Sequence, residues 1–228
     1  MTIKIYGHPW SINTRKVLAA IAENGQEAEL VLVMVPKGEH KAASHLALHP
    51  FGKVPVLEHD GVVIYETRAI QRYLQHLAPR SALVPSEAVA AARVEQWMSV
   101  ADSYFIPFAH PLLVEVLFRR FIGGEQQAEV IRAGREGMGF ALDVANEHLK
   151  KSAFFAGNGF SLADIHWMPY LDYLTQTGEA EPIRAREHLF AWWERVSARP
   201  SWQRVARSGP QPYERGITAD VIEKLYPG

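Results

Sequence analysis

The spacing of apolar residues divides the chain into two parts near residue 80. In the first part, Thr2–Tyr6 alternates apolar and polar residues as a strand does, and Thr14–Asn24 has helical spacing that stops before Gly25. Glu29–Val35 is rich in residues that favour strands. These patterns predict the order strand, helix, strand.

A second group of elements follows a segment without clear periodicity. Pro55–Glu58 and Val62–Tyr65 are short apolar runs joined through Asp60-Gly61, a pair that favours the type I′ turn of a β-hairpin. Helical spacing resumes over Glu66–Leu77. The combined βαβ–ββα order predicts a small α/β domain over residues 1–79.

The pattern becomes helical after a predicted linker at residues 80–88, and no further strand is expected. Ala88–Arg120 is a long helical stretch in which Pro107 and Pro111 are expected to kink or break the helix. Glu125–Lys151 is predicted as a second long helix.

A third helix, predicted over Ser161–Gln176, has a well-marked start. Ser161 as N-cap and Asp164 three residues later fit a capping box, while Phe160 and Ile165 stand where a hydrophobic staple would.

Two shorter helices and a tail complete the prediction. Glu187–Arg199 and Ser201–Arg207 are separated by Pro200, and residues 209–228 are expected to be an extended tail. Residues 89–228 therefore form a predicted all-helical domain, which makes the fold class α/β plus all-α.

Composition narrows the possible partners. The 228 residues are 48% hydrophobic, and 24 Lys and Arg against 25 Asp and Glu give a net charge of -1, so no nucleic acid is expected to bind. No apolar run is long enough to span a membrane and the start lacks a signal peptide, so we expect no membrane partner and a cytoplasmic location. The ten His show no paired ligand spacing, so no metal site is expected.

The chain contains no cysteine, which excludes several kinds of site. A disulfide, an iron–sulfur cluster, a catalytic thiolate and a CxxC redox pair all require cysteine. Any sulfur chemistry must therefore use a thiol that arrives on a ligand.

The segment GHPWSINT, residues 7–14, connects the first predicted strand to the first helix. Backbone N–H groups and a partial positive charge at a helix N-terminus favour an anion there, and Ser11, Asn13 and Thr14 add polar donors. The segment fits an anion or thiolate site, and it equally fits a simple helix cap.

Three further segments carry possible ligand-binding groups. Val54-Pro55 opens a strand, where a cis bond would leave the backbone of Val54 free to pair with a peptide, although trans is the commoner isomer. Glu66 and Thr67 begin a helix and could hold an ammonium and a carboxylate, or only cap it.

The third segment is cationic. His40 and Lys41, together with Lys53, could bind a second carboxylate, or they could form a solvated surface of charges.

Taken together, these segments resemble those of the glutathione S-transferase family, most closely its phi-like, serine-type branch. The resemblance covers essentially the whole chain and rests on GHPWSINTRKVL, GEHK, HPFGKVPVLE, YETRAIQRYL and FSLADI. It implies a thioredoxin-like N-terminal domain that binds glutathione as co-substrate, a helical domain that completes an electrophile pocket, no permanent cofactor, and a homodimer.

The resemblance also assigns roles to individual residues. Ser11 falls on the catalytic serine, Pro55 on the cis-proline, and the remaining glutathione contacts on His40, Lys41, Lys53, Val54, Glu66 and Thr67. Lys53, Thr67 and His49 stand where many phi sequences have Gln, Ser and Asn. Thr67 keeps a hydroxyl and Lys53 keeps a donor, so glutathione binding is little affected by these departures.

The electrophile pocket and the dimer are predicted from fewer residues. Trp10 and Ile12 flank Ser11 and should face the cleft beside the sulfur. The candidates to complete the pocket, each of which could instead be plain core, are Phe105, Phe108, Leu112 and Tyr170. Phe51 matches the family position that inserts into the partner subunit, and Asp102 is expected to approach the partner's glutathione.

The expected function is conjugation of glutathione to hydrophobic electrophiles, a detoxification reaction, with Ser11 stabilising the thiolate. A glutathione-dependent peroxidase or isomerase on the same scaffold is one alternative. A non-catalytic binding protein that keeps the fold is another, because related folds host several functions.

Overall fold

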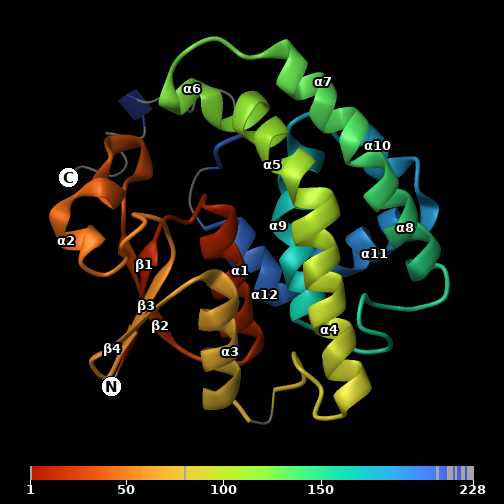
Figure 1. Ribbon diagram of the computed structural model, residues 1–228, viewed down its shortest axis with the longest axis horizontal. Coiled ribbons are helices and arrows are strands. Elements are labelled where there is room, and N and C mark those ends of the chain that lie inside the picture. The colour runs from red at the N-terminus through yellow and green to blue at the C-terminus, as the bar shows by residue number, and fades with distance from the viewer. Residues whose placement is uncertain are drawn as a thin grey trace.

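The computed structural model describes residues 2–79, 81–208, 211–214, 218, 220, 221 and 224. Figure 1 shows a small sheet with its helices beside a larger group of helices. The elements described up to residue 79 are β1 (Ile3–Gly7), α1 (Ile12–Glu23), β2 (Ala28–Leu32), η1 (Val35–Lys37), η2 (Glu39–Lys41), α2 (Ala43–Leu46), β3 (Val56–His59), β4 (Val62–Tyr65) and α3 (Thr67–Leu77).

The sheet has the strand order β2-β1-β3-β4. β1 and β2 are parallel, since α1 crosses between them, whereas β3 pairs antiparallel with both β1 and β4. Asp60 and Gly61 both have positive φ, 51° and 78°, as a type I′ turn requires. The predicted thioredoxin-like βαβ–ββα arrangement is confirmed.

One face of the sheet packs against α1 and α3, which Figure 1 shows between the sheet and the remaining helices. Ile5 and Leu57 of the sheet are fully buried against Val17 of α1 and against Ile70 and Leu74 of α3. This small core fixes the loop that connects β1 to α1.

The second part is helical, as predicted. Its described elements are α4 (Ala88–Val100), η3 (Ala101–Phe105), α5 (Ile106–Leu113), η4 (Val114–Phe118), α6 (Arg119–Ile122), α7 (Ala128–Gly137), α8 (Gly139–Leu149), α9 (Leu162–Gln176), α10 (Glu181–Arg184), α11 (Glu187–Ser197) and α12 (Pro200–Ala206). α9 is buried over Leu162–Leu174 and forms the centre of this part (Figure 1).

The predicted capping box of α9 is confirmed. Asp164 accepts hydrogen bonds from the backbone N–H and the hydroxyl of Ser161, and the Ser161 hydroxyl accepts from Ala163 N. Asp164 also accepts from Phe155 N and Trp192 Nε1. The box therefore ties the start of α9 to α11 as well as capping it.

The stretch predicted over Ala88–Arg120 stays helical through Pro107 and Pro111, but it contains two π-helical turns. In η3 the Ile106 N–H donates to Ala101 O, and in η4 the Arg119 N–H donates to Val114 O, five residues back in each case. The prolines are accommodated by these wider turns without a break.

The single helix predicted over Glu125–Lys151 is wrong: two helices, α7 and α8, meet at Met138. Gly137 precedes this junction, and a Cβ there would lie 2.1 Å from Cδ1 of Phe108. The glycine permits close packing of α7 on α5, and glycine also favours the interruption.

The predicted extended tail, residues 209–228, lies mostly outside the described residues. Gln211 is described and is buried, and its Oε1 accepts a hydrogen bond of 2.5 Å from Arg15 Nη2.

A buried arginine joins the two parts of the molecule. Besides Gln211, the fully buried Arg15 of α1 donates to Pro9 O, to Asp172 of α9 at 2.9 Å and to Ala206 O of α12. We call this group the Arg15 clamp. It holds the first helix of the sheet domain against two helices of the second part.

Candidate functional site

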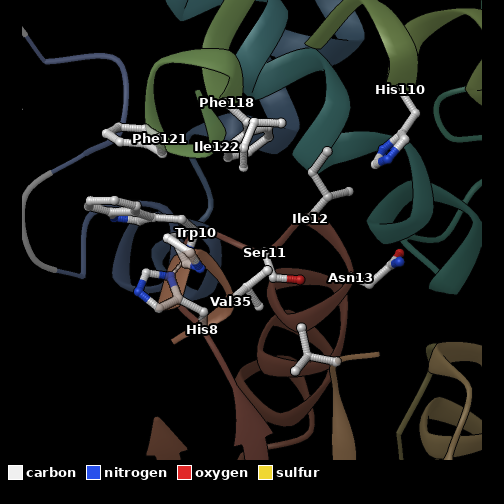
Figure 2. A pocket seen from close by; sticks show the side chains of 12 residues that line it. His8, Trp10, Ser11, Ile12, Asn13, Val35, His110, Phe118, Phe121 and Ile122 are labelled. Carbon is white, nitrogen blue, oxygen red and sulfur yellow. Dashed lines mark hydrogen bonds between the residues drawn. The ribbon is translucent and has the colours of Figure 1, made fainter. Parts of the chain in front are cut away.

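A cavity of about 200 Å³ opens above the N-terminus of α1, between the sheet domain and the helices that follow (Figure 2). It is lined by His8, Trp10, Ser11, Ile12, Asn13, Val35, Pro36 and Val54 from the sheet domain and by His110, Phe118, Phe121 and Ile122 from α5, η4 and α6. Most of these side chains are apolar, as is typical of small-molecule sites.

Ser11 is both the N-cap of α1 and part of this lining. Its Oγ accepts a hydrogen bond from Thr14 N at 3.3 Å. A hydroxyl has one donor hydrogen and two lone pairs, so this cap contact leaves the O–H available to donate. The cap and the ligand-binding interpretations of Ser11 are therefore compatible.

Gly7 sets the approach of this loop to α1. A Cβ on Gly7 would lie 2.6 Å from Oγ1 of the buried Thr14, which is closer than side chains can approach. The absence of a side chain at Gly7 allows β1 to end directly beneath the first turn of α1, where Ser11 meets the cavity.

His8 lies beside Ser11 and is almost fully buried. Its Nδ1 accepts a hydrogen bond from Trp10 N at 3.2 Å. Burial lowers the pKa of His8 to about 4, with Arg15 acting in the same direction. His8 is therefore neutral near pH 7 and orients the backbone that carries Trp10.

The bond between Val54 and Pro55 is cis, as predicted. Pro55 is buried, whereas Val54 lines the cavity directly before β3 begins. The preceding residue is also fixed, since Lys53 O lies 2.8 Å from Nε2 of the buried His45.

The predicted cationic residues come together on two adjacent loops. Gly52 lets the loops meet: it has a φ of 57°, and a Cβ there would lie 2.6 Å from His40 O. Lys41 Nζ donates to Phe51 O at 3.0 Å. Burial and the positive charges of Lys41 and Lys53 lower the pKa of His40.

Glu66 and Thr67 lie where β4 joins α3. Glu66 is exposed and has a φ of 72°, a left-handed conformation that costs a non-glycine residue energy. Strain of this kind is often found at binding sites. Thr67 begins α3, so its backbone N–H is one of the unpaired donors of that helix.

Asp102, predicted to approach a partner's glutathione, is engaged within its own chain. Its Oδ1 lies 2.7 Å from His166 Nε2, and its Oδ2 accepts from Arg68 at 3.3 Å. His166 Nε2 is in turn 3.5 Å from Nζ of Lys16 on α1. We call Lys16, His166, Asp102 and Arg68 the seam network.

Charges in the seam network are partly suppressed. Burial lowers the pKa of Lys16 to about 7, although Asp102 acts in the opposite direction. Burial and the nearby Lys16 lower the pKa of His166 to about 4, outweighing Asp102. Near pH 7 His166 is therefore neutral.

Of the predicted electrophile-pocket residues, the structure brings Trp10 and Ile12 to the cavity. Phe105, Leu112 and Tyr170 are buried in the helical core, and the ring of Phe108 packs over Gly137. None of these four is among the described residues that line the cavity.

The helical side of the cavity is formed by residues that the sequence did not single out. Phe118, Phe121 and Ile122 have the three- and four-residue spacing of one helix face, and the ring centroids of Trp10 and Phe121 are 5.6 Å apart. In the sequence, this spacing of apolar residues around two arginines was the signal that could have identified one apolar helix face. His110 had no comparable signal.

Two kinds of feature are absent from the described residues. They contain no group of His, Asp or Glu arranged to hold a metal ion. None of their helices is both long and apolar enough to cross a membrane.

Comparisons with known proteins cover both parts of the chain. Residues 1–76 match the family model of the glutathione S-transferase N-terminal domain, and residues 98–200 match that of the C-terminal domain. Glutathione S-transferase 3 of Zea mays is 36% identical over 214 residues, covering 92% of this chain and 96% of the relative.

Solved structures are also similar. Glutathione transferase F7 from Populus trichocarpa has a TM-score of 0.86 at 33% identity, covering 90% of this chain and 98% of its own. Glutathione S-transferase I from mais, in complex with an atrazine glutathione conjugate, has a TM-score of 0.85 at 29% identity, covering 95% and 100%.

Proposed function

Because this chain belongs to the glutathione S-transferase family and is a glutathione transferase, we propose that Ser11 activates bound glutathione for conjugation to hydrophobic electrophiles. The observation that carries this proposal is the position of Ser11, whose side chain caps α1 and also lines an apolar cavity. We also propose the phi-like, serine-type branch, which the F designation of the Populus relative supports.

The activation requires little energy. A thiol with a pKa near 8.5 is only about 3% thiolate at pH 7, and a pKa lower by about 2 needs roughly 2.7 kcal/mol. A charge-assisted hydrogen bond from the Ser11 hydroxyl contributes about 1.5–3 kcal/mol, and the N-terminus of α1 adds about 0.3–1 kcal/mol. Ser11 keeps its own proton, and the proton of the thiol goes to solvent.

Glutathione would lie along the edge of the sheet domain. Glu66 binds its γ-glutamyl ammonium, and Thr67 at the start of α3 binds the neighbouring carboxylate. The backbone of Val54 beside cis-Pro55 pairs with the cysteinyl unit. His40, Lys41 and Lys53 attract the glycyl carboxylate, which the shared positive potential of their two loops supports.

The electrophile would occupy the apolar side of the cavity next to the sulfur. Trp10 and Ile12 from the sheet domain face Phe118, Phe121 and Ile122 across it. Such a lining favours hydrophobic electrophiles, which fits a role in detoxification.

We further propose a homodimer. Phe51 is 66% exposed at the tip of the loop before Val54, where its ring contacts His49 edge to face and leaves most of its surface open to a second chain. Phe51 would insert into the helices of a second copy, and Asp102 on η3 would approach the partner's glutathione. The proposed domain limits are 1–79 and 89–228, with a linker at 80–88.

The dimer is tested by light scattering at micromolar concentration. The wild type should scatter as about twice 25.6 kDa, whereas Phe51→Ala should scatter as one chain because the inserted ring is lost. A wild type that scatters as a single chain would rule out the dimer.

The conjugation proposal is tested with purified enzyme, glutathione and a chloronitroaromatic substrate. We expect saturable formation of the glutathione adduct and, by calorimetry, binding of glutathione alone. A protein that binds glutathione but forms no adduct with aromatic halides or isothiocyanates, and does not oxidise glutathione to its disulfide with hydroperoxides, would be a binding protein and would contradict the proposal.

A further inference from the structure

The helical side of the cavity contains one polar group. Among the described residues that line the cavity, α5, η4 and α6 contribute Phe118, Phe121, Ile122 and a single polar side chain, His110. Figure 2 shows His110 reaching from α5 toward Ile12 and Asn13, above the N-terminus of α1. A lone imidazole on an apolar wall can orient a ligand through a hydrogen bond.

The ring of His110 is held in place by packing, and its nitrogens have no hydrogen-bond partner among the described residues. It contacts Tyr170 edge to face, with ring centroids 6.3 Å apart, and it makes no hydrogen bond with the part of the chain that the structure describes. The imidazole is exposed to the cavity. Both ring nitrogens are therefore available, and either can carry the hydrogen.

The surroundings of His110 favour its neutral form. Although His110 is exposed at the cavity, desolvation by the atoms packed around its ring lowers its pKa, and the positive charges of Lys16 and Lys53 act in the same direction. A neutral imidazole has one N–H donor and one acceptor nitrogen, so at neutral pH it offers a single hydrogen bond to a substrate oxygen.

We propose that His110 determines specificity by donating a hydrogen bond to the carbonyl oxygen of the electrophile, so that the enzyme favours α,β-unsaturated carbonyl compounds. The proposal rests on the glutathione conjugation proposed above. A solvated histidine on a helix surface is the simpler interpretation, but His110 is the one polar side chain that the helical wall contributes among the described residues lining the cavity, so it is placed to bind a polar group of a ligand there.

The reaction balances without a further reactant. The thiolate sulfur forms a bond to the β-carbon, and the electron pair of the carbon–carbon double bond moves to leave an enolate on the carbonyl oxygen. Solvent then protonates the α-carbon, replacing the proton that the thiol released. His110 keeps its hydrogen, and its hydrogen bond strengthens as negative charge develops on the oxygen.

The test compares two electrophiles in the same enzyme. The α,β-unsaturated ketone 4-phenylbut-3-en-2-one has a carbonyl oxygen, whereas benzyl chloride has no oxygen acceptor. The variants are His110→Phe, which keeps a flat ring, His110→Gln, which keeps an N–H donor, and His76→Gln, an exposed control on α3. The readout is the ratio of kcat/KM for the ketone to kcat/KM for benzyl chloride.

We expect His110→Phe to lower this ratio about tenfold, as the loss of one donor to a developing oxyanion does at the weaker end. His110→Gln should restore most of the ratio, and His76→Gln should leave it unchanged. A ratio that stays the same in His110→Phe, or equal losses with both substrates, would overturn the role of His110.

Failure of the underlying function gives a different result. If the wild type conjugates benzyl chloride and the His110 variants have the same ratio as the wild type, the transferase function stands and only the proposal on His110 is overturned. A wild type that binds no glutathione and forms no adduct with either substrate overturns both proposals.

Discussion

The two walls of the cavity differ in how they are built. The sheet-domain wall comes from residues 8–13, from η1 and from the segment before β3. Each of these follows or precedes a strand of the one sheet. The helical wall comes from residues spread over α5, η4 and α6, with a π-helical turn on either side of α5. The side chains of the first wall are positioned by local geometry. Those of the second are positioned by how far the π-helical turns rotate the residues that follow them.

This difference suggests a division of labour. Under the proposed function, the sheet-domain wall binds glutathione and activates its sulfur through residues other than Trp10 and Ile12, so changes at those other residues should affect every electrophile equally. The helical wall contacts the second substrate, so changes there should affect electrophiles unequally. Substitutions on each wall test whether the two substrates are bound separately in this way.

The largest effect is expected for Ser11→Ala on the sheet-domain wall. Loss of one donor to the thiolate should lower turnover roughly ten- to a thousandfold with every electrophile, while glutathione affinity changes little. The midpoint of the pH profile of kcat/KM should move upward, toward the pKa of the free thiol. Steady-state kinetics between about pH 5.5 and 9 measures both, spanning the reference thiol pKa.

Wild-type turnover with an unmoved midpoint in Ser11→Ala would make Ser11 only the N-cap of α1. The control is Asn13→Ala, which removes another polar group from the same lining. Activity lost in that variant instead would move the activating role to Asn13.

A smaller effect is expected for Glu66→Ala. Loss of a charge-assisted hydrogen bond to the ammonium should weaken glutathione binding about ten- to a hundredfold, with the pH midpoint unchanged. Calorimetry with glutathione measures the affinity. Glu66→Gln serves as the matched control, because it keeps the size and removes the charge; native affinity in both variants would exclude Glu66 from the site.

On the helical wall, Phe121→Leu removes the ring that lies against Trp10. Aromatic pairs contribute about 0.5–1.5 kcal/mol, so KM for an aromatic electrophile should rise about two- to tenfold. KM for glutathione and activity toward a small aliphatic electrophile should change little. Equal losses with aromatic and aliphatic substrates would show that the two walls do not act separately.

The smallest effect at neutral pH is expected in the seam network, which lies outside the cavity and joins α1 and α3 to η3 and α9. His166 has its pKa lowered to about 4 in the folded protein, against about 6.5 when unfolded. Below about pH 6.5 the unfolded chain binds a proton that the folded chain does not, so the free energy of unfolding falls as pH decreases toward 4. The slope is at most about 1.4 kcal/mol per pH unit for this group.

Urea unfolding between about pH 4.5 and 7.5, which covers most of that window and extends above it, measures this slope. His166→Gln should have a shallower acid slope than the wild type, with His8 as a remaining contributor of the same sign. His76→Gln is the exposed control. An unchanged slope in His166→Gln would mean that His166 is already protonated in the folded protein.

The same contrast explains what the sequence could predict. The hairpin turn at Asp60-Gly61 and the capping box at Ser161 depend on neighbouring residues and were predicted from them, whereas the cis bond before Pro55 was predicted with the help of the family resemblance. The loop that places Ser11 in the cavity is equally local, because β1 and α1 fix both of its ends.

The helical wall could not be predicted in the same way. A π-helical turn adds a residue and rotates the following side chains by about 100° relative to a regular helix. Phe105 and Leu112 were candidates for either the cleft or the core, and the structure buries both and brings Phe118 to the cavity instead. The break between α7 and α8 was not predicted. Gly137 beside it is packed against Phe108 of α5, and this tertiary contact cannot be read from the sequence.

The Arg15 clamp has a consequence for how this enzyme can be re-engineered. Its hydrogen bonds join Pro9, Asp172 and Ala206, and none of its partners lines the cavity. One neighbour of the clamp does reach the cavity lining: Arg15 lies over the ring of Tyr173, which contacts the ring of Phe118 and donates a hydrogen bond to Trp10 O. Under the proposed function, residues 119–122 can therefore be exchanged to select new electrophiles with less effect on the loop that carries Ser11 than an exchange that includes Phe118.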